Sequence, residues 1–307
     1  MFARIAIVGS GSIGTYYGVR LALTGLDVRF LLRSDLTAVQ ARGSLVVYGK
    51  SGREELRPAA VFATTAEIGP VDLVIVTLKT TTNVALDTLL PPLLRPDTAI
   101  LTLQNGLGAD EFIADRFGAH RVLGGLAFIC ATRTGPGEVH CAHPGSVTLG
   151  EFGRRPVERT RQLALRFEAA GVKTRVAADL LEARWRKLVW NVPFNGLAIA
   201  RGGITTDVIC ADPTLAAEAL GLMQEVQRAA AAFGFCIPDK FLHGQLEVTP
   251  GMGAYAPSSL VDFQAGRAVE VESIWGEPLR RAQSAGVAVP RLAALYAQLQ
   301  RLSGGAV

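Results

Sequence analysis

Several features that mark other classes of protein are scarce in this chain of 307 residues. It contains only four cysteines and no C-x-x-C pair, so the sequence indicates neither a disulfide framework nor a redox pair. No uninterrupted apolar run reaches membrane-spanning length, and a glycine turn follows Met1 too soon to leave room for a signal region. We therefore expect a cytoplasmic protein without a membrane partner.

Blocks of charge of one sign are also missing. The 31 Lys and Arg residues and the 27 Asp and Glu residues give a net charge of +4, and the basic residues are scattered. Because nucleic-acid binding relies on clustered basic residues, we expect no nucleic-acid partner. Hydrophobic residues make up 49% of the chain, which is ample for packed cores, and the length is typical of about two domains.

Metal-ligand patterns are missing as well. Cys130, His140, Cys141 and His143 are close in sequence, but their spacing fits no zinc-ligand pattern. Adjacent residues of a strand point to opposite faces, so His140 and Cys141 would not share one site. We expect no metal.

What the sequence does contain begins at its N-terminus. The apolar run over residues 5–8 predicts a strand, residues 12–23 predict a helix, and a Gly-x-Gly-x-x-Gly turn lies between them. Such a turn brings the backbone and the helix N-terminus close to a pyrophosphate, which favours a dinucleotide over an ordinary strand-to-helix turn. The expected cofactor contacts are Gly9, Ser10, Gly11, Ser12, Ile13 and Gly14.

The end of the next expected strand, residues 28–32, selects the cofactor. An NAD enzyme usually has a carboxylate there for the ribose hydroxyl, whereas this chain has Leu32 followed by Arg33. A guanidinium matches a phosphate in shape and charge, so Arg33 predicts NADPH/NADP. The alternative is Asp35, which would be the ribose acid if the strand ran longer, or simply the N-cap of the next helix.

Two further strands end in polar residues. Residues 72–79 form an apolar strand that ends at Lys79, and residues 98–103 form another that ends in Gln104-Asn105-Gly106. Ligands of open α/β sheets bind at the carboxyl ends of the strands, which favours a site role for Lys79 over that of a solvated lysine. Residues 122–151 are expected to form short strands punctuated by glycine.

A long helix is expected from Asp179 onward. Lys187, Asn191 and Asn195 are spaced four apart and share one face, while most of their neighbours are apolar. An exposed polar stripe is the alternative, but a buried row of one cation and two amides indicates a polar ligand. Pro193 should kink this helix or remove a backbone bond. Further helices are expected over residues 213–234, 258–264, 269–286 and 290–302.

In this order, the motifs resemble those of the ketopantoate reductase (2-dehydropantoate 2-reductase) family, over nearly the whole chain. The resemblance rests on the glycine turn, Arg33, Lys79, Gln104-Asn105-Gly106 and the row Lys187-x-x-x-Asn191-x-x-x-Asn195. It extends to Pro257-Ser258-Ser259-Leu260-x-Asp262-x-x-x-Gly266-Arg267-x-x-Glu270.

The resemblance implies an α/β Rossmann-type dinucleotide-binding domain, residues 1–178, followed by an all-α C-terminal substrate and catalytic domain, residues 179–307. It implies reduction of a 2-oxo acid with NADPH. Lys187 would be the proton donor, and Glu270 would lie beside the substrate and the nicotinamide. Asn191, Asn195 and Ser258 would bind the substrate, and Lys79 and Asn105 would be active-site or cofactor contacts.

The chemistry supports these roles. Hydride delivery to a 2-oxo carbon leaves negative charge on the oxygen, and a positioned ammonium stabilises and protonates it. Pro193 and Val269 depart from the usual pattern of the family near the substrate, so a close analogue of ketopantoate stays open. Two other functions also stay open: another two-domain dehydrogenase, of opine or hydroxyacyl type, and a catalytically silent NADPH sensor. We expect a monomer or a homodimer.

Overall fold

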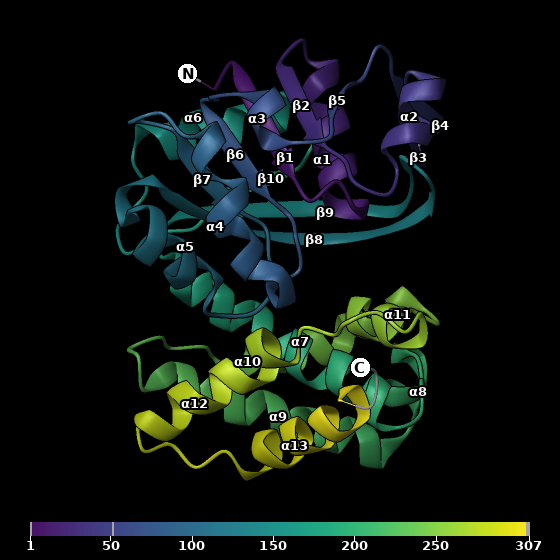
Figure 1. Cartoon of the computed structure of the whole chain (residues 1–307). Helices are drawn as coiled ribbons and strands as arrows, with labels where there is room; N and C mark the ends of the chain where they lie inside the picture. The colour runs from purple at the N-terminus through teal and green to yellow at the C-terminus, as the bar shows by residue number, and fades with distance from the viewer. Residues whose placement is uncertain (1, 51, 305–307) are drawn as a thin grey trace. The chain divides into compact units, whose positions relative to one another are not determined.

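The chain divides into two compact units in the computed structural model, which describes residues 2–50 and 52–304 (Figure 1). The Rossmann unit comprises Met1–Gln104 and Ala109–Leu180. The helical unit comprises Asn105–Gly108 and Leu181–Val307. Four residues from the first half of the sequence therefore belong to the helical unit.

A parallel sheet forms the centre of the Rossmann unit. Strand β1 (Arg4–Val8) lies between β2 (Asp27–Leu31) and β6 (Leu73–Val76), and β7 (Ala99–Thr102) follows β6. Strands β1, β6 and β7 are almost entirely buried, as a parallel sheet covered on both faces requires. Their carboxyl ends therefore meet at one edge of the sheet, with Val8 beside Val76.

The rest of the sheet is mixed. The full order is β4-β3-β9-β8-β7-β6-β1-β2-β5, with β10 paired to β9. The remaining strands are β3 (Leu45–Gly49), β4 (Gly52–Leu56), β5 (Ala60–Phe62), β8 (Val122–Gly135), β9 (Glu138–Glu151) and β10 (Thr174–Val176).

The expectation of short strands over residues 122–151 was wrong. Strands β8 and β9 are 14 residues each and run side by side as one long antiparallel hairpin (Figure 1). The glycines mark close packing rather than strand ends, since a Cβ at Gly124 or Gly150 would press on Leu180.

Helices flank the sheet of the Rossmann unit. They are α1 (Ser12–Leu23), α2 (Leu36–Arg42), α3 (Thr65–Ile68), α4 (Leu86–Leu89), α5 (Ala109–Phe117) and α6 (Glu158–Ala169). Helix α1 packs closely because Gly18 has no Cβ; one there would overlap the ring of Phe30. Tyr17 of α1 meets Phe167 of α6, with ring centroids 5.6 Å apart.

The helical unit is built around α7 (Leu180–Ala200), which continues through Pro193. Trp185 and Phe194 of α7 are fully buried, and the Trp275 indole N–H donates to the Val192 carbonyl at 2.9 Å. The other helices are α8 (Thr206–Ala211), α9 (Pro213–Ala231), α10 (Asp239–Val248), α11 (Ser258–Gln264), α12 (Glu277–Ser284) and α13 (Pro290–Ser303). The α/β and all-helical fold classes are thus as predicted.

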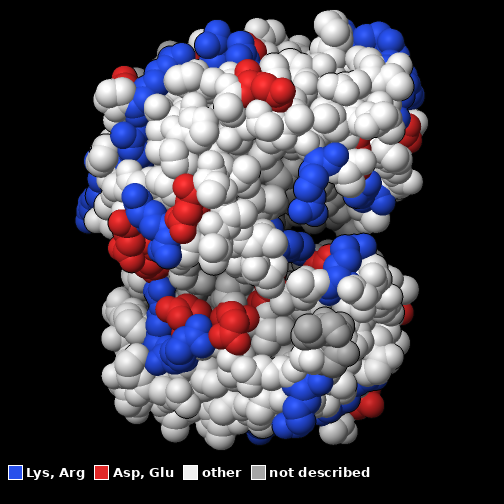
Figure 2. Space-filling model, in the orientation of Figure 1, with Lys and Arg blue, Asp and Glu red and all other residues white. Residues whose placement is uncertain are grey.

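Basic and acidic side chains are mixed on the surface of each unit in the view of Figure 2. Among the described residues, no helix combines the length and the apolar character needed to cross a membrane. Nor do three or more His, Cys, Asp or Glu residues in the described part of the chain form a group that could hold a metal ion.

Candidate active site

The glycine turn joins β1 to α1, and its three glycines have different surroundings. Gly9 has a φ of +107°, and a Cβ there would be 2.5 Å from the Leu78 nitrogen. A Cβ at Gly14 would overlap the Gly9 carbonyl oxygen and lie 2.9 Å from Ile7 Cγ2. A Cβ at Gly11, in contrast, would have no atom of the described residues within 4 Å. Gly9 and Gly14 are therefore required by the fold, whereas Gly11 keeps an open space.

That open space lies at the N-terminus of α1. Gly11 is the N-cap and has no side chain to bond the first N–H groups, and the first turn has no acidic residue. Such a helix end favours an anion. Ser10 Oγ donates to the Leu31 carbonyl at 2.9 Å, which fixes the turn to the end of β2. The turn therefore fits the pyrophosphate of a dinucleotide.

Arg33 and Asp35, the two candidates for binding the adenosine ribose or its 2′-phosphate, differ in whether their side chains already have partners. Arg33 is exposed, and its guanidinium forms no hydrogen bond or ion pair with any residue that the structure describes. Asp35 is buried; its carboxylate pairs with Arg133 and accepts from the Gly137 N–H at 2.8 Å. Asp35 holds the N-cap position of α2 but makes no side-chain cap bond. The carboxylate is thus engaged elsewhere, and the free guanidinium of Arg33 fits a 2′-phosphate.

Lys79 lies at the same sheet edge as the glycine turn. It directly precedes η1 (Thr80–Ala85), just beyond the carboxyl end of β6, and is half-buried. Gln104 supports this edge, because its side-chain amide donates to the Leu78 carbonyl at 2.8 Å and to Asn83 at 2.7 Å. Sequence reasoning placed Gln104 near the site but missed this supporting role.

The Asn105–Gly108 loop packs within the helical unit. The Leu107 N–H donates to the Ser273 carbonyl at 2.9 Å, and a Cβ at Gly106 would overlap that carbonyl. Ser273 belongs to a π-helical turn, η5 (Glu272–Gly276), that leads into α12. Such turns are frequent at functional sites. The loop is therefore held against the turn that follows Glu270.

Lys187 of α7 has an ammonium group whose charge is buried in the helical unit. Its ammonium donates to Asn105 Oδ1 at 2.8 Å. The pKa of Lys187 is lowered to about 7, mainly because its charge is buried and also because the Arg184 guanidinium repels it, whereas the Glu270 carboxylate opposes the change. As a whole residue Lys187 is half-buried, so it is partly accessible. A lysine in this state can give up a proton near neutral pH.

Arg184 was missed from the sequence. It is 3% exposed, and its guanidinium lies 3.4 Å from the Gly106 carbonyl. The signal was available, since Arg184 precedes Lys187 by three residues and shares its side of α7. Two cations on neighbouring turns disfavour each other's charge, which is consistent with the lowered pKa of Lys187.

The remaining predicted residues lie in the same unit. Asn191 is 8% exposed, Asn195 is 2% exposed and Glu270 is 4% exposed, so the exposed-stripe alternative is wrong. Asn195 accepts from the Ser259 N–H at 3.0 Å. Ser258, the first residue of α11, is exposed, whereas Ser259 is buried. Of the two serines, Ser258 is the accessible one.

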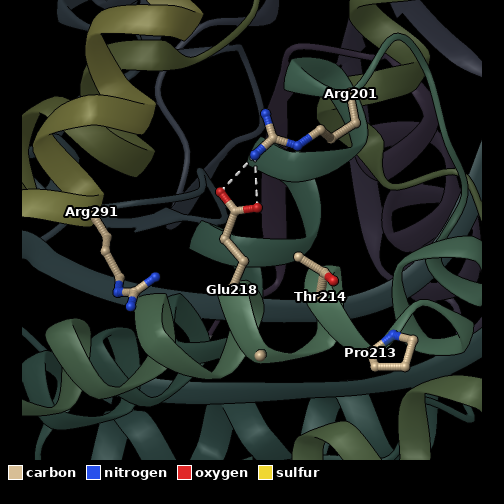
Figure 3. Close-up of a pocket in the computed structure, with 6 residues that line it drawn as sticks. Arg201, Pro213, Thr214, Glu218 and Arg291 are labelled. Atoms are coloured by element: carbon tan, nitrogen blue, oxygen red, sulfur yellow. Dashed lines mark hydrogen bonds and ion pairs between the residues drawn. The ribbon is translucent and has the colours of Figure 1, made fainter.

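A surface hollow of about 610 Å³ elsewhere in the helical unit involves none of these residues. It is lined by Arg201, Pro213, Thr214, Ala217, Glu218 and Arg291. Figure 3 shows Arg201 and Glu218 joined by two hydrogen bonds, at 2.8 and 2.7 Å, so much of its charge is already paired.

Comparison with known proteins covers both units. The family described as "Ketopantoate reductase PanE/ApbA" matches residues 5–154, and "Ketopantoate reductase PanE/ApbA C terminal" matches residues 179–303. A 2-dehydropantoate 2-reductase of Nostoc sp. is 39% identical over 306 residues, which cover 98% of this chain and 95% of the relative.

Solved structures similar to this chain carry the same enzyme name. That of 2-dehydropantoate 2-reductase from Geobacter metallireducens is 43% identical, with a TM-score of 0.94, and the match covers 97% of this chain and 99% of that one. The enzyme of the same name from Methylococcus capsulatus is 35% identical, with a TM-score of 0.91 and coverage of 99% and 97%.

Proposed function

The chain belongs to the ketopantoate reductase family, and we propose that it reduces 2-dehydropantoate, or a closely similar 2-oxo acid, with NADPH. It is accordingly an NADP-dependent oxidoreductase that acts on a carbonyl group. The observation that carries the proposal is the ammonium of Lys187, which has a pKa of about 7 and lies 2.8 Å from the amide oxygen of Asn105. A silent sensor would have no need of such a group.

In the proposed mechanism NADPH supplies a hydride to the 2-oxo carbon. Lys187 donates a hydrogen bond to the carbonyl oxygen, stabilises the charge that develops there and transfers its proton. Asn105 accepts a hydrogen bond from this ammonium at 2.8 Å and so keeps it in position. Glu270 is buried and raises the pKa of Lys187, so it keeps enough of the lysine protonated to act.

Cofactor binding is assigned to the turn and to three side chains. We assign the pyrophosphate to Gly9, Ser10, Gly11, Ser12, Ile13 and Gly14. Arg33 would bind the 2′-phosphate, which its exposure and the lack of a partner for its guanidinium in the described residues support. Lys79 would contact the cofactor from the end of β6, and Asn105 would contact the cofactor or the substrate.

For the substrate we assign Asn191 and Ser258 as direct contacts, while Asn195 stays a predicted contact. Neutral amides and a hydroxyl can orient a carboxylate without adding a competing charge. Residues 1–178 would serve as the NADP-binding domain and residues 179–307 as the substrate domain. We propose that the enzyme works in the cytoplasm; a monomer or a homodimer stays a prediction.

The test is a panel of 2-oxo acids assayed with NADPH by the loss of nicotinamide absorbance. We expect 2-dehydropantoate or a branched analogue to give the highest kcat/KM. Replacing Lys187 by alanine should lower kcat by about 10²- to 10⁴-fold, the usual contribution of a positioned acid, with little change in NADPH affinity.

Lys240→Ala is the matched control, because Lys240 is an exposed lysine of α10 in the same unit. It should leave kcat unchanged. Undiminished turnover in Lys187→Ala would remove the mechanism, and NADPH binding without turnover of any oxo acid would favour the sensor.

A further inference from the structure

Helix α7 has few side chains that a ligand can reach. From residue 184 to residue 200, those that keep partial exposure are Arg186, Lys187, Trp190 and Ala200. Arg186 is already paired with Glu182 at 2.8 Å, and Ala200 is the last residue of the helix. Trp190 is therefore the large apolar side chain that this part of α7 presents to a ligand.

Trp190 lies next to the groups that we assign to the substrate. It follows Lys187 by three residues and directly precedes Asn191. Side chains three apart on a helix are neighbours, with their Cβ atoms about 5–6 Å apart. A small molecule that binds the Lys187 ammonium is therefore within reach of the indole ring.

The indole ring is held in one orientation. Its N–H donates to Thr249 Oγ1 at 3.0 Å, at the start of η4 (Thr249–Met252), and Thr249 is fully buried. The ring also stacks on Phe194, with centroids 5.0 Å apart and an angle of 28° between the planes. A ring that is fixed before binding loses little conformational entropy when a ligand packs against it.

Tyr255 extends this aromatic surface toward α11. Its ring centroid lies 6.2 Å from that of Trp190, and its side chain is partly exposed. The backbone helps to hold it there, because the Tyr255 carbonyl accepts from the Thr206 N–H at 3.0 Å. Ser258, which we assign to the substrate, follows three residues later. Trp190 and Tyr255 thus form an aromatic surface that begins beside Lys187 and ends near the start of α11.

We propose that this aromatic surface determines which 2-oxo acids the enzyme accepts, with Trp190 as the specificity-determining residue that contacts an apolar substituent on C3 of the substrate. The inference rests on the proposed function and deepens it by naming the substrate class. Methyl groups on C3 lose contact with water against the ring, which is favourable. A second carboxylate against the same ring would lose hydration, which is costly.

The kinetic test compares two oxo acids that differ only at C3. On this carbon 2-oxoisovalerate carries two methyl groups, and pyruvate carries none. The wild type should prefer 2-oxoisovalerate in kcat/KM, and Trp190→Ala should lower this preference about tenfold, because apolar contacts of single methyl groups contribute on this scale. Trp190→Phe keeps a ring face and should lower it by no more than about threefold. If Trp190→Ala lowers kcat/KM equally for both acids, the preference is unchanged and the proposal is overturned.

Tryptophan fluorescence provides a readout that does not depend on turnover. Trp185 and Trp275 are fully buried, so Trp190 is the accessible one of the three tryptophans. With NADP, the oxidised cofactor, bound, 2-oxoisovalerate should protect this fluorescence from quenching by acrylamide. Calorimetric binding of 2-oxoisovalerate without any protection would refute the contact. The measurement uses the wild type, so it remains decisive even if Trp190→Ala does not fold.

A failed reduction and a failed contact give different results. A wild type that reduces no 2-oxo acid refutes the proposed function, and protection of Trp190 by 2-oxoisovalerate would then still support the contact. A wild type that reduces 2-oxoisovalerate and pyruvate with equal kcat/KM upholds reduction of 2-oxo acids and refutes the role of Trp190 in specificity.

Phe233→Ala is the matched control. Phe233 is also an aromatic side chain with an exposed part, and it stacks on another tryptophan of α7, Trp185, with centroids 5.8 Å apart. It is not among the residues that we assign to substrate or cofactor, so this variant should leave the preference for 2-oxoisovalerate unchanged. A fall as large as that in Trp190→Ala would mean that any loss of aromatic packing in the helical unit changes the preference, and it would overturn the proposal.

Discussion

At the scale of single residues, the site depends on how charge is buried. Lys187 and Arg184 are two cations on neighbouring turns of α7, and one buried carboxylate, Glu270, faces their charge. When Lys187 is neutral, the positive charge of Arg184 and the negative charge of Glu270 cancel. An anionic substrate would add a negative charge and favour the protonated lysine, so substrate binding and the readiness to donate a proton are coupled.

The first prediction concerns pH. Lys187 must be protonated to act as an acid, so kcat/KM should fall as the pH rises through about 7, the pKa of Lys187 in the folded chain. The measurement is a pH profile of kcat/KM. A profile that stays flat up to pH 9 would contradict the assignment.

The same pKa affects stability. The folded state holds fewer protons than the unfolded state between about pH 7 and the ordinary lysine value of 10.5, so stability should rise with pH across this window. Lys187→Met removes the buried ammonium. Its thermal stability should exceed that of the wild type at pH 7, and this gain should shrink toward pH 10 in thermal melts.

The second prediction concerns Arg33. Arg33→Ala should weaken NADPH binding by about 10- to 100-fold, because charge-assisted hydrogen bonds to a phosphate contribute about 1.5–3 kcal/mol. NADH binding should hardly change. Fluorescence titration measures both, and Arg155→Ala, at another exposed arginine of the Rossmann unit, is the control. Equal losses for the two cofactors would place the 2′-phosphate elsewhere.

At the scale of elements, two glycines of the β1–α1 turn serve different purposes, one for packing and one for ligand binding. Gly14 is pressed against Gly9 and Ile7, whereas the space above Gly11 is open. Gly14 is therefore needed because the strand and the helix pack closely there, whereas Gly11 would be needed only to make room for a ligand. The two requirements can be tested one residue at a time.

The third prediction uses this contrast. Gly14→Ala should destabilise the chain by about 1–3 kcal/mol through overpacking. Gly11→Ala should change stability by less than about 0.5 kcal/mol yet weaken NADPH binding by about tenfold or more, because the new methyl group would occupy the path of the pyrophosphate. Chemical denaturation and NADPH titration of both variants measure this. Wild-type affinity in Gly11→Ala would argue against the turn as the pyrophosphate site.

At the scale of the whole molecule, ligand binding should appear as stability. At 100 times its Kd, NADPH should stabilise the folded chain by about 2.7 kcal/mol, which corresponds to a rise in Tm of roughly 5–10 °C. Lys187→Ala should keep this rise, whereas Gly11→Ala, with an affinity lowered tenfold or more, should keep about half of it or less at the same concentration, as measured by differential scanning fluorimetry. Loss of the rise in Lys187→Ala would mean that the lysine serves cofactor binding.

Much of the fold could be read from local patterns. The strand over residues 5–8, the helix α11 and the start of α13 were predicted closely, because hydrophobic period, glycine and proline act over a few residues. Helix α10 was missed, and the hairpin of β8 and β9 was predicted as short strands. In the hairpin, packing against a distant residue outweighed the local signal, as Leu180 does at Gly124 and Gly150.

By itself, the sequence determined the glycine turn between the first strand and helix, the cation Arg33 after the second strand and the row that carries Lys187, since each follows from residue types at short spacings. Only the tertiary structure decided that Asn105, 82 residues away, receives the Lys187 ammonium, that Asp35 is engaged with Arg133, and that the amide of Asn195 holds α11. The physical reason is that a buried polar group must find a partner, and which partner it finds depends on how distant segments pack.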